Sequence, residues 1–440
     1  MKHSNRLSIV FITALMLSLI LMSCSNQDTS NSQNNNNGNT STDSENHASP
    51  GSSNGDASEP TVTATPSPSP SPKPTFDPVQ QEINSMSIDE KVGQLLIFGV
   101  DGTSLSSTAK DMIINNKIGG FILYKENIVN AKQIVDFLNE LKQTNNQSNT
   151  VPLWLSVDEE GGRVNRLPSE FKKIPTARSI GDKQNANYTN GIGQAIGFAL
   201  HDLGFNMDFA PDLDINSNPD NPVIGDRSFG TTADRVINQG IEMMKGISSG
   251  GVAAVVKHFP GHGDTSVDSH HDLPIVKKTL EQLSQFELLP FEEAIKEDVD
   301  AIMVAHLLML QIDDQHPASI SKAVITDLLR KQLSYDGVVI TDDMTMGGLM
   351  KGNNIGEAAV ASILAGSDLI LVGHDSSLQL EVLKSLKQAV NSGQISEERL
   401  NESVSRILRL KNKYKLSDAA APQADVDAIN KRLQEALNNQ

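Results

Sequence analysis

The feature of this sequence that most restricts its fold is a regular alternation of short β-rich runs with longer segments of helical periodicity. Ile134, Leu138 and Leu141, for example, recur at the spacing of one helix face. Because each run is followed by enough residues for a helix, the alternation predicts parallel strands joined by helical crossovers. The β-rich runs are residues 95–100, 120–124, 153–157, 207–210, 253–258, 301–306, 338–341 and 369–372.

Eight strand–helix units indicate an α/β fold of the (β/α)₈ TIM-barrel type, formed by residues 79–416 as a single catalytic domain. An open, doubly wound sheet is the alternative, because it is built from the same alternation. Residues 417–440 are polar and Ala-rich, and we expect them to form a C-terminal tail that is either a terminal helix or loose.

The N-terminal residues have the features of a targeting segment. Lys2 and Arg6 precede an apolar stretch, residues 7–22, which is too short for a comfortable membrane span. The stretch ends at Ser23-Cys24, and Cys24 is the only cysteine, which excludes internal disulfides and Cys-rich metal sites. This arrangement resembles the lipobox of bacterial lipoproteins. The resemblance implies that residues 1–23 are a signal peptide and that Cys24 is lipidated; an ordinary signal peptide or anchor is the alternative.

Residues 24–78 are dominated by Asn, Ser, Thr, Gly and Pro. Such a segment cannot bury enough apolar surface to offset the entropy of ordering, so we expect a disordered linker. Together with the lipobox, the linker predicts a protein exported and lipid-anchored to the outer face of the bacterial cell membrane, with no other contact to lipid.

The net charge excludes one class of partner. With 36 Lys and Arg against 54 Asp and Glu, the chain carries −18, and residues 1–78 contribute only −3 of it (three basic against six acidic residues). The predicted barrel is therefore acidic and lacks the basic footprint that nucleic acid requires. We expect a monomer without a metal or other cofactor.

In a barrel of this type the chemistry lies in the loops that follow the strands, so polar residues are expected there. They do occur there: Asp158-Glu159-Glu160 follows the third predicted strand, Asp212 and Asp214 follow the fourth, and Asp342-Asp343 follows the seventh. Histidines gather after the fifth, sixth and eighth strands. This distribution predicts an active site at the carboxyl end of the barrel.

These segments together resemble bacterial glycoside hydrolase family 3 β-N-acetylglucosaminidases. The similarity covers most of residues 85–375 and is carried by KHFPGHGDTSVDSHHDLP (257–274), VDEEGGRVNR (157–166), APDLDI (210–215), GDRSFG (225–230) and GVVITDDMTMGG (337–348). The resemblance implies a barrel enzyme that removes terminal β-linked N-acetylhexosamine from peptidoglycan (muropeptide) or chitin fragments, with retention of configuration.

Retention requires a carboxylate nucleophile and a group that first donates and then accepts a proton. By the motif register, Asp342 matches the nucleophile and Asp343 is the neighbouring rival. The Asp-Ser-His loop implies that His270 is the acid/base, with Asp268 orienting and polarising the imidazole. His271 is its rival in register.

The resemblance also implies which residues bind the terminal sugar: Asp158, Arg166, Arg227, Lys257 and His258. Carboxylates can accept from two hydroxyls, and the cations donate to them. The alternative for Asp158, Arg166 and Arg227, together with Arg163, is an internal salt-bridge network. Aromatic residues number only 18 (13 Phe, 4 Tyr and 1 Trp), which favours a small terminal-sugar pocket over a long cleft.

Several other functions fit parts of the pattern. Within the family, a broader β-glucosidase or xylosidase and a β-N-acetylglucosaminide phosphorylase are alternatives. A metal-dependent barrel hydrolase would use the histidines and aspartates as ligands, although the first predicted strand lacks a His-x-His. A substrate-assisted enzyme would use Asp158-Glu159 as an adjacent acid pair. A lipoprotein that binds sugars without turnover is the last alternative.

Overall fold

The computed structural model describes residues 77–439. The expected signal peptide, Cys24 and nearly all of the expected linker lie outside the described residues. Within the described part of the chain, no helix is both long enough and apolar enough to cross a membrane.

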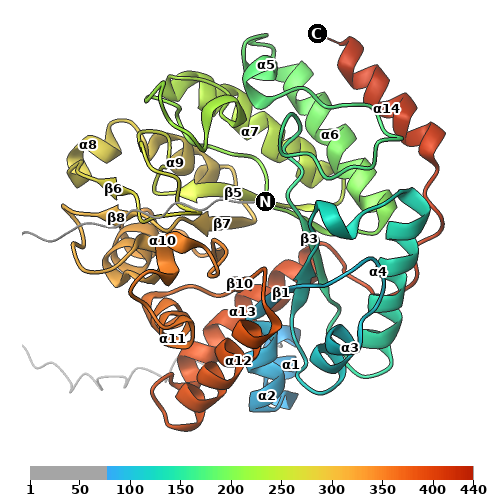
Figure 1. The fold of residues 1–440 in the computed structure, drawn as a ribbon, viewed down its shortest axis with the longest axis vertical. Coiled ribbons are helices and arrows are strands. Elements are labelled where there is room, and N and C mark those ends of the chain that lie inside the picture. Colours follow the sequence, from blue (N-terminus) through green and yellow to red (C-terminus); the bar gives the residue numbers. More distant parts are fainter. Residues whose placement is uncertain (1–76, 440) are drawn as a thin grey trace, which may run out of the picture. The chain divides into compact units, whose positions relative to one another are not determined.

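Eight parallel strands form the barrel predicted from the sequence (Figure 1). They pair in the order β10-β1-β2-β3-β4-β5-β7-β9, and a single parallel bridge between Ile340 and Leu369 joins the two ends of this row. Each strand coincides with one of the eight β-rich runs. The strands are β1 (Leu96–Gly99), β2 (Gly120–Ile122), β3 (Trp154–Val157), β4 (Met207–Asp208), β5 (Ala253–Phe259), β7 (Ala301–Val304), β9 (Val338–Thr341) and β10 (Ile370–Val372).

Helices follow the strands and surround them. The larger ones are α3 (Ser107–Ile114), α4 (Ala131–Asn146), α6 (Ala186–Leu203), α7 (Ala233–Ser249), α9 (Leu289–Lys296), α11 (Ile355–Ala365), α12 (Ser376–Asn391) and α13 (Glu397–Lys413). Shorter segments are α5 (Ala177–Gly181), α8 (Leu280–Ser284), α10 (Gly347–Met350), η1 (Lys125–Asn127), η2 (Gly225–Arg227) and η3 (Ala318–Ile320). The crossover after β7 is a π-helix, η4 (Ala323–Gln332).

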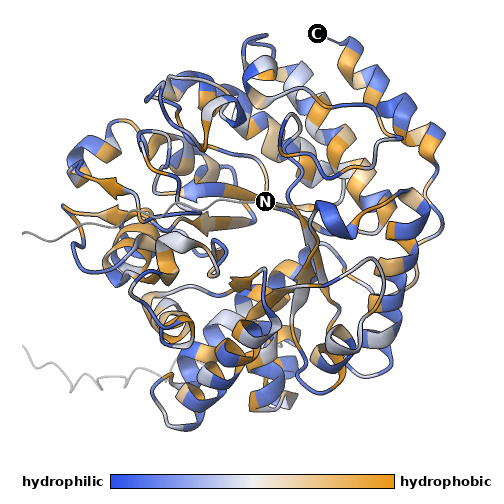
Figure 2. Cartoon of the chain, viewed as in Figure 1, coloured by the Kyte–Doolittle hydropathy of each residue, from blue (hydrophilic) through white to orange (hydrophobic). Residues whose placement is uncertain are grey.

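Burial explains why the strands could be predicted from the sequence. All residues of β1, β3, β5, β7 and β9 are buried, because helices cover one side of each strand and the barrel core covers the other. The outer helices are instead amphipathic: α6 and the C-terminal α14 (Val426–Asn438) alternate between hydrophilic and hydrophobic along their length (Figure 2).

The first two helices and the last helix of the described residues pack on the outside of the barrel. Helices α1 (Pro78–Ser85) and α2 (Ile88–Gln94) pack on α13, and α14 packs on α6. Ser87 and Glu90 form a capping box that fixes the start of α2.

One small sheet was not predicted from the sequence. Strands β6 (Ile275–Val276) and β8 (Leu308–Met309) pair in parallel outside the barrel. β6 closes the long loop after β5, and β8 follows the end of β7, so this sheet anchors the loop that contains Asp268 and His270.

Candidate active site

A cavity of about 340 Å³ opens at the carboxyl ends of the barrel strands. Side chains from the ends of β2, β3, β5, β7, β9 and β10 and from their loops contribute to its wall. Seven of the residues predicted from the sequence line it: Asp158, Arg166, Arg227, Lys257, His258, His270 and Asp342. The structure thus brings together residues that are up to 184 positions apart (342 − 158).

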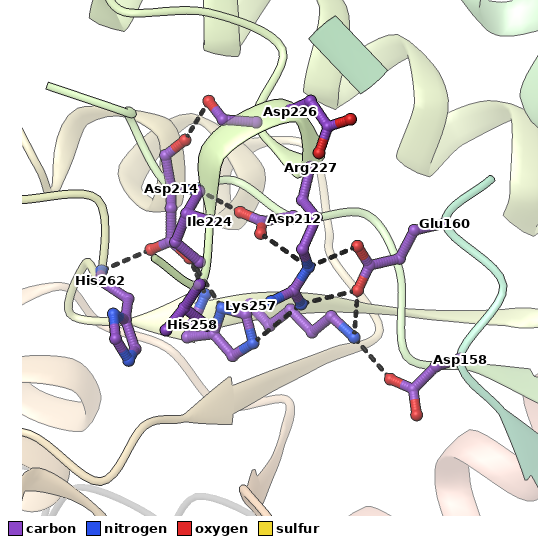
Figure 3. Close-up of polar contacts among 12 residues, drawn as sticks. Asp158, Glu160, Asp212, Asp214, Ile224, Asp226, Arg227, Lys257, His258 and His262 are labelled. Carbon is purple, nitrogen blue, oxygen red and sulfur yellow. Dashed lines mark hydrogen bonds and ion pairs between the residues drawn. The ribbon is translucent and has the colours of Figure 1, made fainter. Parts of the chain in front are cut away.

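The least exposed wall of the cavity is a chain of ion pairs (Figure 3). Lys257 Nζ lies 2.6 Å from Asp158 Oδ1 and 2.8 Å from Glu160 Oε1. Arg227 donates to both oxygens of Glu160, each over 2.8 Å. Glu160 therefore holds the two cations side by side, and Asp158 keeps an oxygen free for the cavity.

The charges of this wall are mutually stabilised. Burial alone would raise the pKa of Glu160, but Arg227 and Lys257 hold it well below its usual value. Burial would likewise lower the pKa of Lys257, whereas Asp158 and Glu160 keep it above its ordinary range. Glu160, Lys257 and Arg227 are consequently ionised at neutral pH.

His258 is a neutral hydrogen-bonding group in this wall. Burial lowers its pKa to about 4, and the nearby Arg227 acts in the same direction. Its Nδ1 lies 2.7 Å from Asp214 Oδ2, so the proton of the neutral ring is placed on Nδ1, where it is donated to that carboxylate. Nε2 is then an acceptor, 3.4 Å from Arg227 Nη2 and directed to the cavity wall.

Asp214 also fixes the start of the next loop. Its Oδ1 accepts from the backbone amide of His262 over 2.6 Å. The His262 ring is held between Thr265 Oγ1 at 2.7 Å and Ser269 Oγ at 3.0 Å. Burial lowers the pKa of His262 to about 3, so this histidine positions the loop as a neutral ring.

Asp342 stands at the carboxyl end of β9 and lines the cavity. Burial would raise the pKa of this carboxyl, but the neighbouring His258 and His306 and the amide of Asp343 hold it below its usual value. The Asp343 amide donates to Oδ1 over 2.8 Å, which leaves Oδ2 available to a ligand. Asp342 is thus an ionised carboxylate that faces the cavity.

Asp343, the rival in sequence, has its carboxylate engaged by the protein. Its Oδ1 accepts from the amide and the hydroxyl of Thr345, each over 2.9 Å, and from the amide of Gly373 over 2.9 Å. The ring of His306 approaches the Asp343 carbonyl oxygen at 3.0 Å. These contacts make Asp343 a support for the loops after β9 and β10.

His270 lies at the more exposed side of the same cavity, where its side chain is 58% exposed. Its Nδ1 is 2.8 Å from Asp268 Oδ1, and its backbone amide donates to the same oxygen over 2.8 Å. Since Asp268 accepts at Nδ1, Nε2 is the nitrogen left to meet a ligand. His271, the rival in register, does not belong to the cavity lining.

Arg166 enters the cavity from the loop after β3. Its backbone amide donates to Glu159 Oε2 over 2.6 Å, while its buried side-chain Nε has no hydrogen-bond partner. Arg163, by contrast, pairs with Asp226 at 3.0 Å and donates to the carbonyls of Val223 and Ile224. The salt-bridge network considered from the sequence therefore exists in part, but it runs through Glu160 and leaves Arg166 with an unused donor.

The structure does not support a substrate-assisted mechanism in which Asp158 and Glu159 act as an adjacent acid pair. Glu159 is fully buried, lies outside the cavity lining, and accepts from the backbone amides of Gly161, Arg166 and Leu167. Its carboxyl shapes the loop and has no access to a substrate.

One group of residues has potential metal ligands close together: atoms of Asp212, Asp214 and His258 lie within 4.8 Å of one another. His258 Nδ1 is already hydrogen bonded to Asp214, and Arg227 Nε lies 3.8 Å from Asp212 Oδ2. A divalent cation there would be next to a fixed guanidinium, so this donor set does not suit a metal.

Sequence reasoning placed Glu160 and Asp214 near the site but assigned no supporting role to them or to Ser269. Their positions after predicted strands were a signal that they lie near the site, but their partners come from other loops. Which loops meet is decided by the barrel, and sequence spacing does not encode it.

Known proteins resemble this chain in sequence and in fold. Residues 87–410 match the sequence model of the glycosyl hydrolase family 3 N-terminal domain. Beta-hexosaminidase A of Pseudoalteromonas piscicida is 36% identical over 341 residues, which cover 72% of this chain and 57% of that protein. Beta-hexosaminidase of Idiomarina loihiensis is 32% identical over 292 residues, which cover 66% of this chain and 86% of that protein. The chain thus spans little more than half of the first relative and most of the second.

Among solved structures, a glycoside hydrolase family 3 beta-N-acetylglucosaminidase from a Paenibacillus species is 42% identical to this chain. The two superpose with a TM-score of 0.76, over 80% of this chain and 68% of that one. The barrel fold is therefore shared with a protein of that description.

Proposed function

The chain belongs to glycoside hydrolase family 3, and on that basis we propose that it is a retaining, exo-acting β-N-acetylhexosaminidase that releases terminal β-linked N-acetylglucosamine. The observation that carries the proposal is the shared cavity of Asp342 and the Asp268-bound His270. One carboxylate and one oriented proton donor on a single small cavity are what a double displacement requires.

In the first step the Asp342 carboxylate attacks the anomeric carbon, and a bond forms between its oxygen and that carbon. The bond from the anomeric carbon to the glycosidic oxygen breaks, and protonated His270 delivers the proton from Nε2 to that oxygen. The leaving sugar departs as an alcohol, and the terminal sugar stays bound to Asp342 as an ester.

In the second step neutral His270 removes a proton from water, whose oxygen attacks the anomeric carbon. The ester bond breaks and the carboxylate of Asp342 is restored. Asp268 holds the ring through Nδ1 in both steps, so the same Nε2 alternates between donor and acceptor.

The terminal sugar is held by the least exposed wall of the cavity. Lys257 and Arg166 donate to its hydroxyls, while Asp158 and His258 Nε2 accept from them. Arg227 acts mainly by holding Glu160 and by facing His258 Nε2. With this wall occupied by one sugar and closed by ion pairs, cleavage is confined to chain ends.

We propose that the substrates are muropeptides or chitin fragments and that no cofactor takes part. A glycosidase of broader specificity or a phosphorylase would use the same two residues, and the substrate panel below separates these from the hydrolase. A sugar-binding lipoprotein would show no turnover at all.

We further propose that the enzyme is exported, acts as a monomer and is attached to the outer face of the cell membrane through lipidated Cys24. The support is the sequence alone, an apolar stretch that ends at the single cysteine. In cells fed labelled palmitate, the wild-type chain should incorporate label and a Cys24→Ala variant should not.

The test of the activity compares aryl glycosides of N-acetylglucosamine, glucose and xylose, each with and without phosphate. We expect the N-acetylglucosaminide to be cleaved fastest, to the free sugar and independently of phosphate. A glucoside cleaved as fast, or a sugar phosphate as product, would overturn the assignment.

A second experiment identifies the nucleophile. A fluorinated N-acetylglucosaminyl fluoride slows hydrolysis of the ester, so the intermediate accumulates. Peptide mass spectrometry should then locate the adduct on Asp342 and on no other residue.

A further inference from the structure

The cavity contains a pair of stacked rings for which the mechanism above has no role. Tyr124 follows β2 and His374 follows β10, and their ring centroids lie 4.6 Å apart with an angle of 23° between the planes. Both residues line the cavity together with Asp342. Two flat side chains, which follow the strands on either side of β1, are thus stacked on each other in the cavity wall.

The carboxylate of Asp343 holds both rings of the pair in place. Tyr124 Oη donates to Asp343 Oδ2 over 3.4 Å, and His374 Nε2 lies 3.9 Å from the same oxygen. Gly373 permits this arrangement, because a β-carbon at that position would clash with the Tyr124 hydroxyl. Asp343 follows Asp342 directly, so the orientation of the rings is tied to the strand end that holds the proposed nucleophile.

Exposure shows which part of the substrate the rings meet. The side chains of Lys257 and Glu160 are 3% and 4% exposed, whereas those of His270 and His374 are 58% and 57% exposed. The terminal sugar occupies the shielded wall. His270 must reach the glycosidic oxygen, so the leaving group extends from that oxygen to the open side of the cavity, where His374 stands.

The chemistry of a ring surface suits a sugar. The apolar face of a pyranose, with its axial C–H groups, packs on a flat π-system, and one side of the His374 ring is already covered by Tyr124. The other rings that line the cavity are not available to stack on a second sugar. Phe209 is buried, and His258 and His262 are buried and hydrogen bonded. His270 is the proposed proton donor and acceptor. The Tyr124–His374 surface is therefore the part of the wall that a second ring can cover.

We infer that the Tyr124–His374 pair is the platform on which the leaving sugar stacks, so that it selects substrates whose leaving group is a β-linked pyranose. This inference rests on the proposed glycosidase function and adds the recognition of the second sugar to it. His374 is the residue that contacts the sugar, and Tyr124 is the positioning residue behind it.

The test uses two substrates whose leaving groups are both alkyl alcohols but differ in having a ring: N,N′-diacetylchitobiose and methyl N-acetyl-β-glucosaminide. In His374→Ala the ratio of kcat/KM for the disaccharide over the methyl glycoside should fall by roughly 3- to 10-fold, the range expected for one stacked ring. His374→Phe keeps a flat ring and should keep the ratio within about 2-fold of wild type. The matched control is His316→Ala, since His316 is also 58% exposed but lies outside the cavity lining.

An unchanged ratio in His374→Ala overturns the inference, and so does an equal loss in His374→Phe and His374→Ala, because the contribution would then be a hydrogen bond. Failure of the proposed function has a different signature, seen in the wild type: slow cleavage of both N-acetyl substrates. In that case the ratio of kcat/KM is measured for cellobiose over methyl β-glucoside in the same variants. A fall in His374→Ala but not in His374→Phe then supports the inference, and an unchanged ratio or an equal loss overturns it.

Discussion

The backbone amide of Gly347 donates to the carbonyl oxygen of His270 over 3.1 Å, which joins the loop of the proposed acid/base to the segment that follows the proposed nucleophile. Gly348 repeats the contact, with the carbonyl of Ser269 at 2.9 Å. The approach is close: a β-carbon on Gly347 would lie 2.8 Å from the His270 carbonyl oxygen and 2.9 Å from that of His271. Two glycines therefore set where His270 stands relative to Asp342.

We predict that Gly347→Ala displaces the His270 loop and weakens proton donation more than it weakens sugar binding. The kcat/KM for an alkyl N-acetylglucosaminide should fall by about 10- to 100-fold, since a misplacement of about 1 Å carries a penalty of that size. The loss should be much smaller for a dinitrophenyl glycoside, whose leaving group needs no proton. Steady-state kinetics on the two substrates measure the difference.

The control for this prediction is Gly191→Ala in α6, where an added β-carbon meets no atom within 4 Å. Both activities of this variant should equal those of wild type, and the helix should be slightly stabilised. An equal loss on both substrates in Gly347→Ala would show general damage to the site and not a displaced acid.

Asp268→Asn should leave the His270 loop in place but remove the acceptor that selects the ring tautomer. An amide can present its NH₂ group to Nδ1, which holds the single proton of the neutral ring on Nε2 and destabilises the doubly protonated ring that acts as the acid. We expect kcat/KM for alkyl substrates to fall by roughly 10²-fold or more, within the usual range for general acid catalysis. Added azide should restore breakdown of the ester intermediate with an activated substrate and yield a glycosyl azide. Absence of that product would remove the acid/base role from the dyad.

The fold was predictable from the sequence because barrel strands are buried on both faces and appear as short apolar runs between amphipathic helices. Val338–Thr341 was predicted at its observed bounds. The two-residue strands β6 and β8 carry no such signal, since their pairing depends on two loops that meet only in the folded barrel. The π-helical hydrogen bonding of η4 was also beyond a pattern that reports only which face is apolar.

The lining of the site was predictable for a related reason: residues that follow parallel strands converge at one end of the barrel. Its pairings were not predictable. Arg227 and Lys257 were expected to meet sugar hydroxyls directly, yet most of their hydrogen bonds go to Glu160. An ion pair between residues 67 positions apart depends on the relative placement of two loops, which a single sequence does not give.

Glu160→Gln should destabilise the protein strongly, because it leaves Arg227 and Lys257 buried with less compensation. Removal of one partner from a buried ion pair costs about 3 to 5 kcal/mol in the free energy of unfolding. Urea denaturation at pH 7 measures the loss. Glu126→Gln is the matched control, since Glu126 is exposed and its substitution should change the free energy of unfolding by less than about 0.5 kcal/mol.

The difference in unfolding free energy between the wild type and Glu160→Gln should also depend on pH. Although burial opposes ionisation, Arg227 and Lys257 hold the pKa of Glu160 in the folded state well below that of the unfolded chain. As the pH falls, the unfolded chain binds the proton first, so the contribution of Glu160 is complete above about pH 5 and is lost progressively below it, as the pH approaches the lowered pKa of the folded state. The difference in unfolding free energy between wild type and Glu160→Gln should therefore shrink over that range. A constant difference would mean that Glu160 keeps an ordinary pKa.

Lys411 is buried at the end of the barrel away from the active site, and we expect it to make the free energy of unfolding rise at alkaline pH. Lys411 Nζ donates to Gln94 Oε1 at 2.8 Å and to the carbonyl oxygens of Gly119 at 3.1 Å and Pro152 at 2.6 Å. It also lies 5.6 Å from the centre of the Trp154 ring. Burial nevertheless lowers the pKa of Lys411 to about 7, and Asp418 opposes this shift only in part.

The sign of the effect follows from which state holds the proton. In the unfolded chain the pKa of a lysine is about 10.4, so between about pH 7 and pH 10 the unfolded chain binds a proton that the folded protein has released. The free energy of unfolding should therefore rise with pH across this range, and urea midpoints at pH 7, 8, 9 and 10 measure the rise. Lys411→Met should lack it, while Lys431→Met on the exposed side of α14 should retain it. A wild-type stability that stays level or falls over these pH values would show that the three acceptors keep Lys411 charged despite its burial.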